Sequence, residues 1–221
     1  MSIWAIVILV MVLSYIIQMV LDSSINQYSK VGINLTGAQV AQQMLRDHGI
    51  NNVSITCIKG HLTDHFDPTK MTVNLSEAVY NGRNVAAAAI AAHECGHAVQ
   101  HATGYAPIRM RSALVPVVSF ANKAVQWVLL LGVLVFSLTP ALLWVGIGLF
   151  ASTTFFSLIT LPVEINASVR ATNWLETAGI TDFETAPMAR KALKWAACTY
   201  VIAALGSVAT LLYYVGMARR N

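Results

Sequence analysis

The chain alternates between long apolar runs and polar segments. Four runs are each long enough to cross a bilayer as a helix, which takes about 20 residues. They predict membrane spans at about residues 3–21, 115–138, 141–161 and 196–217. The first run has neither a basic leading segment nor a small-residue cleavage site, so we interpret it as an uncleaved anchor. Only Thr139 and Pro140 separate the second run from the third, which predicts a tight helical hairpin.

With four spans, the two polar segments, residues 22–111 and 162–194, lie on one side of the membrane and both termini lie on the other. Eleven of the fourteen Lys and Arg residues fall in these two segments. Basic residues are enriched in the cytoplasmic loops of membrane proteins, so both segments are predicted to face the cytoplasm. No basic patch interleaved with aromatic residues appears, and we expect no nucleic-acid partner.

The composition agrees with a membrane protein. Hydrophobic residues make up 56% of the chain and charged residues only 11%, whereas soluble domains carry about 25% charged residues. The three cysteines, Cys57, Cys95 and Cys198, are far apart and form no CxxC pair. They indicate no disulfide framework, which fits a reducing compartment. We expect a single integral-membrane domain over residues 1–221.

Capping residues and apolar spacing predict a small α+β portion in the first polar segment. Thr36 can cap a helix that ends at Gly49. The β-branched run 53–58 and the alternating run 71–76 predict two strands, paired as a hairpin or within a small sheet. The soluble portion therefore mixes helix and strand.

Residues 91–101, with the sequence AAHECGHAVQH, are predicted to lie on a second helix. Asn84 can cap this helix, which is expected over about residues 85–103. His93 and His97 are four residues apart, so they lie on one face of the helix, one turn from each other. Both imidazoles can then reach one Zn²⁺ at bonds of about 2.0–2.1 Å.

Glu94 follows the first of these histidines and is rotated from it by about 100° around the helix. It borders a metal held by the histidines without needing to bind it, and it can accept a proton from a metal-bound water. This is the chemistry of the HExxH motif; the alternative is a pair of surface histidines on an ordinary helix. Gly96 costs roughly 1 kcal/mol of helix propensity relative to Ala, which suggests a steric need for bare backbone beside the metal.

A hydrolytic zinc site needs three protein ligands and one open position. His101 lies about 12 Å along the helix from His93, too far to share one ion, and is expected at the rim. Another candidate group lies in the stretch GHLTDHFDP, a predicted loop that contains His61, Asp64, His65 and Asp67.

Glu164 is the best candidate for the third ligand. It lies in LPVEINASVRATNWLETAG, directly after the third predicted span. A carboxylate in this position must be solvated, paired or bound to metal, because burying it alone is costly. The alternative is an interfacial carboxylate paired with Arg170.

The segments HECGHAVQHATGY, PIRMRSALVPV and LPVEINASVRA together resemble the YugP-like family of membrane-bound neutral zinc metallopeptidases. The resemblance covers essentially the whole chain, including the DHFDP stretch and the four-span layout. More distantly, the chain is similar to HtpX-type and CAAX-type membrane proteases of the gluzincin class, in which a glutamate on a later helix completes the zinc site. The resemblance implies a mainly α membrane protein, with four transmembrane helices and a small zincin-like α+β catalytic portion that carries the HExxH helix.

Carried over by position, the resemblance implies one Zn²⁺ per chain bound by His93, His97 and Glu164, with Glu94 as the catalytic residue. The gluzincin pattern often has an acidic residue four positions after the third ligand, where it orients a zinc-binding histidine. Here that position is Ser168. The candidates for orienting the histidines are Ser168, Asn166 and Asp64. The candidates for stabilising an oxyanion are His61, His65, Arg170 and Asn173.

The predicted function is a membrane-embedded zinc-dependent endopeptidase acting on peptides or membrane proteins. Its location is expected to be a bacterial plasma membrane, with the site at the cytoplasmic surface. Its partners are the substrate and the bilayer, with homo-oligomerisation left open. A strand around Val73 can bind an extended peptide by strand addition.

Two other functions compete with a peptidase. A non-enzymatic membrane scaffold with a structural zinc site has no use for Glu94 as a general base. A metal transporter needs histidines and carboxylates within its spans, and here they lie outside the predicted spans.

Overall fold

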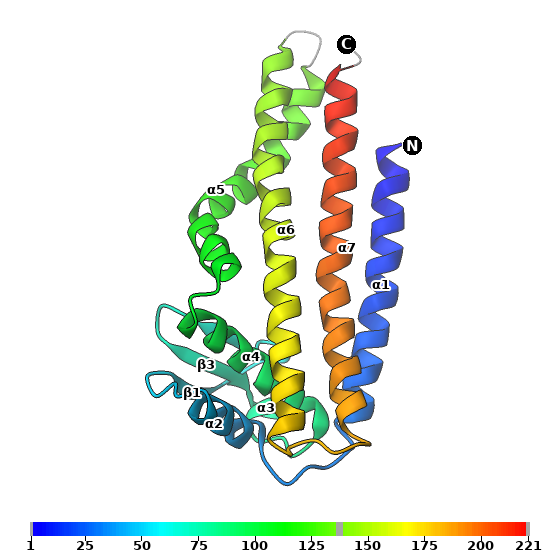
Figure 1. The fold of residues 1–221 in the computed structure, drawn as a ribbon. Coiled ribbons are helices and arrows are strands. Elements are labelled where there is room, and N and C mark those ends of the chain that lie inside the picture. Colours follow the sequence, from blue (N-terminus) through cyan, green and yellow to red (C-terminus); the bar gives the residue numbers. More distant parts are fainter. Residues whose placement is uncertain (1, 136–138, 220–221) are drawn as a thin grey trace.

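The computed structural model describes residues 2–135 and 139–219, and most of these are helical (Figure 1). The long helices are α1 (Ile3–Tyr28), α5 (Ala106–Leu134), α6 (Pro140–Thr177) and α7 (Ala186–Arg219). The shorter elements are α2 (Gly37–Asp47), β1 (Ser54–Ile58), β2 (His65–Asp67), β3 (Thr72–Ser76), α3 (Glu77–Tyr80) and α4 (Val85–Ala102).

The four predicted apolar runs lie on the four long helices, each of which is long and apolar enough to cross a membrane. The end of the second span, residues 136–138, lies outside the described residues. The helices stand side by side in the order α5, α6, α7 and α1, and each packs mainly on its neighbour (Figure 1). Helix α6 continues past its apolar run to Thr177, so Glu164 lies on a continuous helix and not in a loop.

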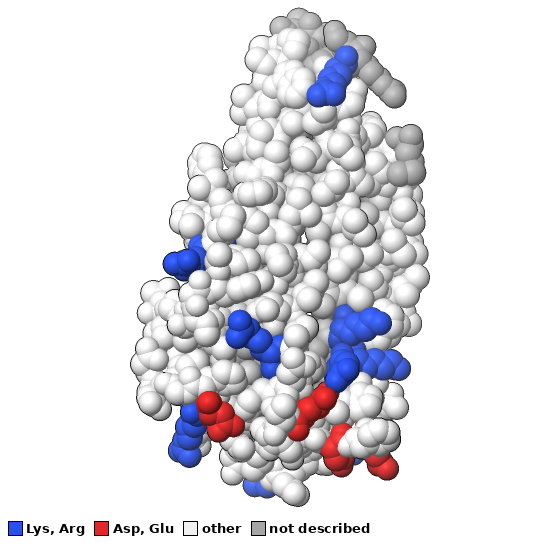
Figure 2. Space-filling model, viewed as in Figure 1, with Lys and Arg blue, Asp and Glu red and all other residues white. Residues whose placement is uncertain are grey.

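Charged side chains are unevenly distributed between the soluble portion and the long apolar helices. Figure 2 shows charged side chains gathered over the lower part of the molecule, around the lower ends of α6 and α7. The long middle stretch of the helices is almost free of charge on this face. The predicted alternation of apolar spans and polar segments is therefore visible on the surface.

Helices α2 and α4 begin at the predicted caps and end within two residues of the predicted ends, whereas α3 was not predicted. Thr36 accepts a hydrogen bond from the backbone of Gln39 at 3.2 Å, and the Gln39 side chain returns one, which forms a capping box at the start of α2. Gly49 follows α2 with φ of +68°, a conformation that favours glycine. Asn84 caps α4 through the backbone of Ala87.

The predicted strands lie in a small sheet, the second of the two predicted arrangements, and not in a hairpin. Its strand order is β1-β3-β2, with β1 parallel to β3 and β2 antiparallel to β3. Strand β2 contains His65 and Asp67, so the predicted loop is partly a strand. Val73 lies on the central strand, whose two edges are already paired, and the prediction of strand addition there is wrong. Of the two outer strands, β2 is the one that packs against α4.

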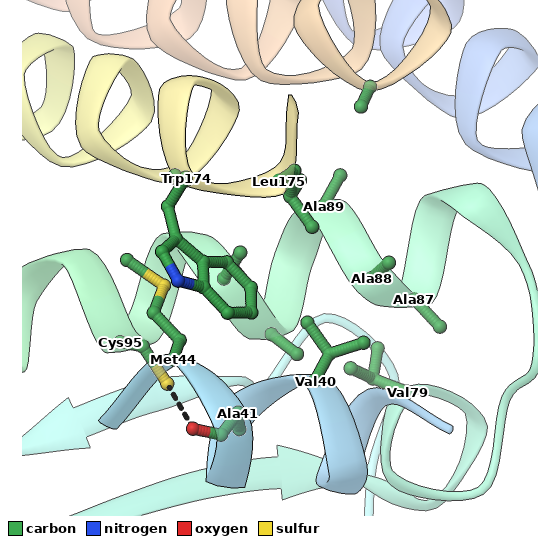
Figure 3. Close-up of a cluster of buried hydrophobic side chains, with 14 of the residues drawn as sticks. Val40, Ala41, Met44, Val79, Ala87, Ala88, Ala89, Cys95, Trp174 and Leu175 are labelled. Carbon is green, nitrogen blue, oxygen red and sulfur yellow. Dashed lines mark hydrogen bonds between the residues drawn. The ribbon is translucent and has the colours of Figure 1, made fainter. Parts of the chain in front are cut away.

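Helix α4 lies at the centre of the soluble portion, between α2 on one side and α6 and α7 on the other. Val40 and Met44 of α2 and Leu175 of α6 are fully buried in the cluster around it (Figure 3). The alanines of α4 bring these helices close to its backbone. The predicted slim helix is therefore the packing centre, and this fixes the position of the HExxH residues.

Candidate metal centre and active site

Gly96 sets the distance between α4 and α6. A Cβ atom at this position would lie 2.7 Å from the carbonyl oxygen of Ala167 and 3.1 Å from its Cα. The two backbones therefore touch at Gly96, and only glycine fits without moving a helix. The sequence suggested bare backbone beside the metal. The observed need is instead the close approach of α6, the helix that carries Glu164.

Three side chains converge where the helices meet. His93 Nε2 lies 3.3 Å from Glu164 Oε2, and His97 Nε2 lies 3.5 Å from the same oxygen. All three potential ligand atoms lie within 4.8 Å of one another. The structure thus brings together the three residues that the resemblance implied as ligands.

This spacing fits a metal ion. Bonds of about 2.0–2.1 Å in tetrahedral geometry place ligand atoms roughly 3.3–3.4 Å apart. Hydrogen bonds between oppositely charged groups are shorter, at about 2.7–2.9 Å. The carboxylate of Glu164 is nearly buried, with 4% of its side chain exposed. Two imidazoles and one carboxylate are also a ligand set that suits catalytic zinc.

Ser168 orients the first histidine. Its Oγ lies 3.2 Å from Nδ1 of His93, so Nδ1 can donate to the hydroxyl while Nε2 points towards Glu164. A metal-binding histidine usually donates its other ring nitrogen in this way. Ser168 therefore stands at the position where gluzincins often have an acidic residue, and its neutral hydroxyl group takes the role of the carboxylate in orienting the histidine.

Gln100 orients the second histidine. Its Nε2 donates to the backbone oxygen of Val163 at 2.7 Å and to Oδ1 of Asn166 at 3.0 Å. Both partners are acceptors, so the amide oxygen of Gln100 must face Nδ1 of His97, which lies 3.0 Å away. Nδ1 of His97 then carries the proton, and Nε2 is left free for a metal. Arg170 completes the chain by donating to Oδ1 of Asn166.

Replacing Gln100 by Leu is expected to weaken zinc binding by about 10- to 100-fold, because His97 loses the partner that fixes its ring. The measurement is zinc affinity in competition with a chromophoric chelator. Gln42→Leu, at an exposed position on α2, is the matched control. Unchanged zinc affinity in the Gln100 variant would show that the ring of His97 is held by other contacts.

Glu94 is 8% exposed and lies on α4 beside the converging side chains. Burial lowers the pKa of His97, but the hydrogen bond that its ring donates to Glu164 and the negative charges of Glu94 and Glu164 outweigh burial. The pKa of His97 therefore lies above the ordinary histidine value. The negative potential that produces this shift is the potential that attracts a cation to the site.

Several residues considered from the sequence, all in the described part of the chain, form no hydrogen bond or ion pair with His93, His97 or Glu164. Asp64 accepts hydrogen bonds from the backbone and hydroxyl of Ser76. His65 lies against Thr63 and Asn74 on the sheet. His61, His101 and Asn173 are exposed, and the ring of His101 lies 5.9 Å from that of Phe66. The interpretation of Glu164 as the ion-pair partner of Arg170 is also wrong, because Arg170 Nε donates to Asn166.

The sequence interpretation missed three residues around the site. Gln100 was overlooked, although it lies on the same helix three residues after His97. Arg111 of α5 places Nη2 4.0 Å from Oε1 of Glu164. The Tyr200 phenol of α7 also lies close to Glu164. Arg111 ends the first polar segment and Tyr200 lies in the fourth predicted span, and each reaches the site only through packing between helices, so no local pattern links them to the HExxH motif.

Comparisons with known proteins agree with this site. Residues 3–219 match a family model described as "Putative neutral zinc metallopeptidase". The chain is 42% identical over 205 residues to "Putative membrane protease YugP" of Bacillus subtilis (strain 168), an alignment that covers 92% of this chain and 90% of that protein. No solved structure matches the chain significantly.

The family match extends over nearly the whole chain and includes the converging side chains of α4 and α6. The relative is itself named a membrane protease, and the described part of this chain has four helices long and apolar enough to cross a membrane. The protein is therefore a membrane protein, and it belongs to the YugP-like family of neutral zinc metallopeptidases.

Proposed function

We propose that the protein is a membrane-embedded, zinc-dependent endopeptidase that cleaves peptides or membrane proteins at the membrane surface. The convergence of His93, His97 and Glu164 beside Glu94 carries this proposal. A structural zinc site is usually closed by four protein ligands. Here three candidate ligands converge, and a carboxylate suited to proton transfer lies next to them.

In the proposed reaction, zinc supplies a Lewis acid that makes water acidic near neutral pH and polarises a carbonyl group. The Glu94 carboxylate accepts a proton from the attacking water as its oxygen bonds to the carbonyl carbon. Glu94 then passes this proton to the peptide nitrogen as the carbon–nitrogen bond breaks. The products are a carboxylate and an amine. Ser168 and Gln100 hold the imidazoles in the orientation that this reaction requires.

The position of the site indicates where substrates are cleaved. Glu164 lies just past the apolar run of α6, and α4 immediately precedes α5, another candidate span. The site is therefore proposed to lie at the bilayer surface. In the zincin-like arrangement that we propose, an extended substrate pairs with the outer edge of β2, which packs against α4.

Metal removal tests the proposed function. The purified protein is expected to hold about one zinc ion per chain and to cleave fluorescein-labelled casein. A chelator should abolish the cleavage, and stoichiometric zinc should restore it. Bound zinc without any cleavage would favour a scaffold, and cleavage that is indifferent to chelation would contradict a zinc peptidase.

We also propose that the soluble portion faces the cytoplasm of a bacterium, and the native cysteines offer a test. The Cys57 thiol is exposed on β1. Cys95 is buried, and burial raises the pKa of its thiol, which keeps it unreactive. With Cys198 replaced by Ser, a membrane-impermeant maleimide is expected to label Cys57 only after the cells are opened. Labelling of intact cells, absent from a Cys57→Ser control, would place the site outside.

A further inference from the structure

Arg111 brings a positive charge to the site from a helix that otherwise belongs to the membrane portion. Nη2 of Arg111 lies 4.0 Å from Oε1 of Glu164. The other oxygen of this carboxylate, Oε2, faces His93 and His97. The guanidinium group therefore lies beside the oxygen of Glu164 that the histidines leave free, and it comes within 4.0 Å of a candidate metal ligand.

The hydrogen-bonding capacity of Arg111 is largely unused. Its Nε is buried and has no hydrogen-bond partner among the described residues. The distance of 4.0 Å to Glu164 exceeds that of a charge-assisted hydrogen bond, about 2.7–2.9 Å. Its side chain is 34% exposed, compared with 4% for Glu164. A buried donor without a partner is costly, and this guanidinium is also open to a group arriving from outside.

The other cation near the site is already engaged. Arg170 donates from Nε to Asn166 and so supports Gln100 and His97. Tyr200 has a hydroxyl group but no positive charge. Arg111 therefore combines charge, free donors and access to a substrate in a way that neither neighbour does.

We propose that Arg111 is a catalytic residue that stabilises the negative charge formed on the substrate carbonyl oxygen. This inference rests on the proposed function. When the water oxygen bonds to the carbonyl carbon, the π electrons of the carbonyl move onto its oxygen, and the proton of the water moves to Glu94. The fixed guanidinium donates hydrogen bonds to this oxygen until the electrons return and the carbon–nitrogen bond breaks. Positioned donors of this kind typically contribute 10²–10³-fold to the rate.

The test compares Arg111→Gln with Arg109→Gln, a matched control at an exposed position two residues earlier on α5. Arg111→Gln is expected to lower kcat on labelled casein by about 10²–10³-fold with little change in KM. Zinc content should remain at about one ion per chain. Arg109→Gln should behave as the wild type. Arg111→Lys, which keeps the charge but loses the planar fork of donors, should fall between them.

A second measurement uses a phosphinic peptide built on a casein site that the wild type cleaves. Its tetrahedral anionic group resembles the transition state, so its affinity should fall by about the same factor as kcat/KM in the Arg111 variants. Unchanged kcat in Arg111→Gln would overturn the proposal. A rise in KM alone would make Arg111 a substrate-binding residue, and loss of zinc would make it a positioning residue for Glu164.

Glu94→Gln, measured in parallel, separates this inference from the proposed function. If Glu94→Gln is inactive while Arg111→Gln keeps full kcat, only the role of Arg111 is refuted. If Glu94→Gln is fully active, the proposed function itself fails, whatever the result for Arg111.

Discussion

Replacing Glu94 by Gln is expected to leave zinc in place and to stop peptide hydrolysis. The amide has nearly the shape of the carboxylate, so the packing around α4 should persist, but it cannot accept the proton of the attacking water. General acid–base catalysis typically contributes 10²–10⁴-fold, and cleavage of labelled casein should fall at least that far. Because Glu94 is not one of the three converging ligands, zinc content should stay near one ion per chain.

Glu77→Gln is the matched control for this change, because Glu77 is exposed at the start of α3. It should cleave casein like the wild type. Undiminished cleavage by the Glu94 variant would eliminate Glu94 as the base. Loss of zinc from the Glu94 variant would show instead that its charge is needed to retain the metal.

Local sequence patterns were sufficient to predict α2, α4, the apolar part of each long helix and the ligand-bearing face of α4. Thr36 and Asn84 act as caps because a short polar side chain can bond the free backbone N–H groups of the first turn. Four-residue spacing fixes His93 and His97 on one face whatever surrounds the helix. The apolar runs predicted the spans because a bilayer requires a minimum helix length.

Features that depend on packing between distant segments could not be predicted in the same way. Strand β2 has three residues, too few to show an alternation of polar and apolar positions, and it exists because β3 pairs with it. The parallel pairing of β1 and β3 also depends on the path of the chain between them. Arg111 reaches Glu164 only because α5 packs on α6.

The candidates for orienting the two zinc-binding histidines illustrate the same limit. The sequence singled out Ser168, Asn166 and Asp64 without ranking them. The structure places Ser168 on His93 and connects Asn166 to His97 through Gln100, whereas Asp64 lies on the sheet. The pattern of residue types could name the groups capable of orienting a histidine, but only the contact between α4 and α6 decides which of them do so.

Replacing Glu164 by Ala is expected to remove most of the zinc and to reduce cleavage to the level of the chelated protein. The change deletes one of three candidate ligands and leaves two imidazoles on a single helix. It also leaves the guanidinium of Arg111 without the carboxylate that lies beside it. Zinc content by mass spectrometry and casein cleavage measure the two effects. Glu184→Ala, in the exposed connection between α6 and α7, should change neither.

The Glu164 variant also tests how the site is built. Gly96 holds α4 against the backbone of α6, so the third ligand can be supplied from a helix that is otherwise part of the membrane portion. Among residues 2–135 and 139–219, no other group of His, Cys, Asp and Glu side chains converges closely enough to hold a metal. Full zinc content in Glu164→Ala would therefore mean that the metal does not bind where these helices meet. In that case neither the role of Glu94 nor that of Arg111 could stand.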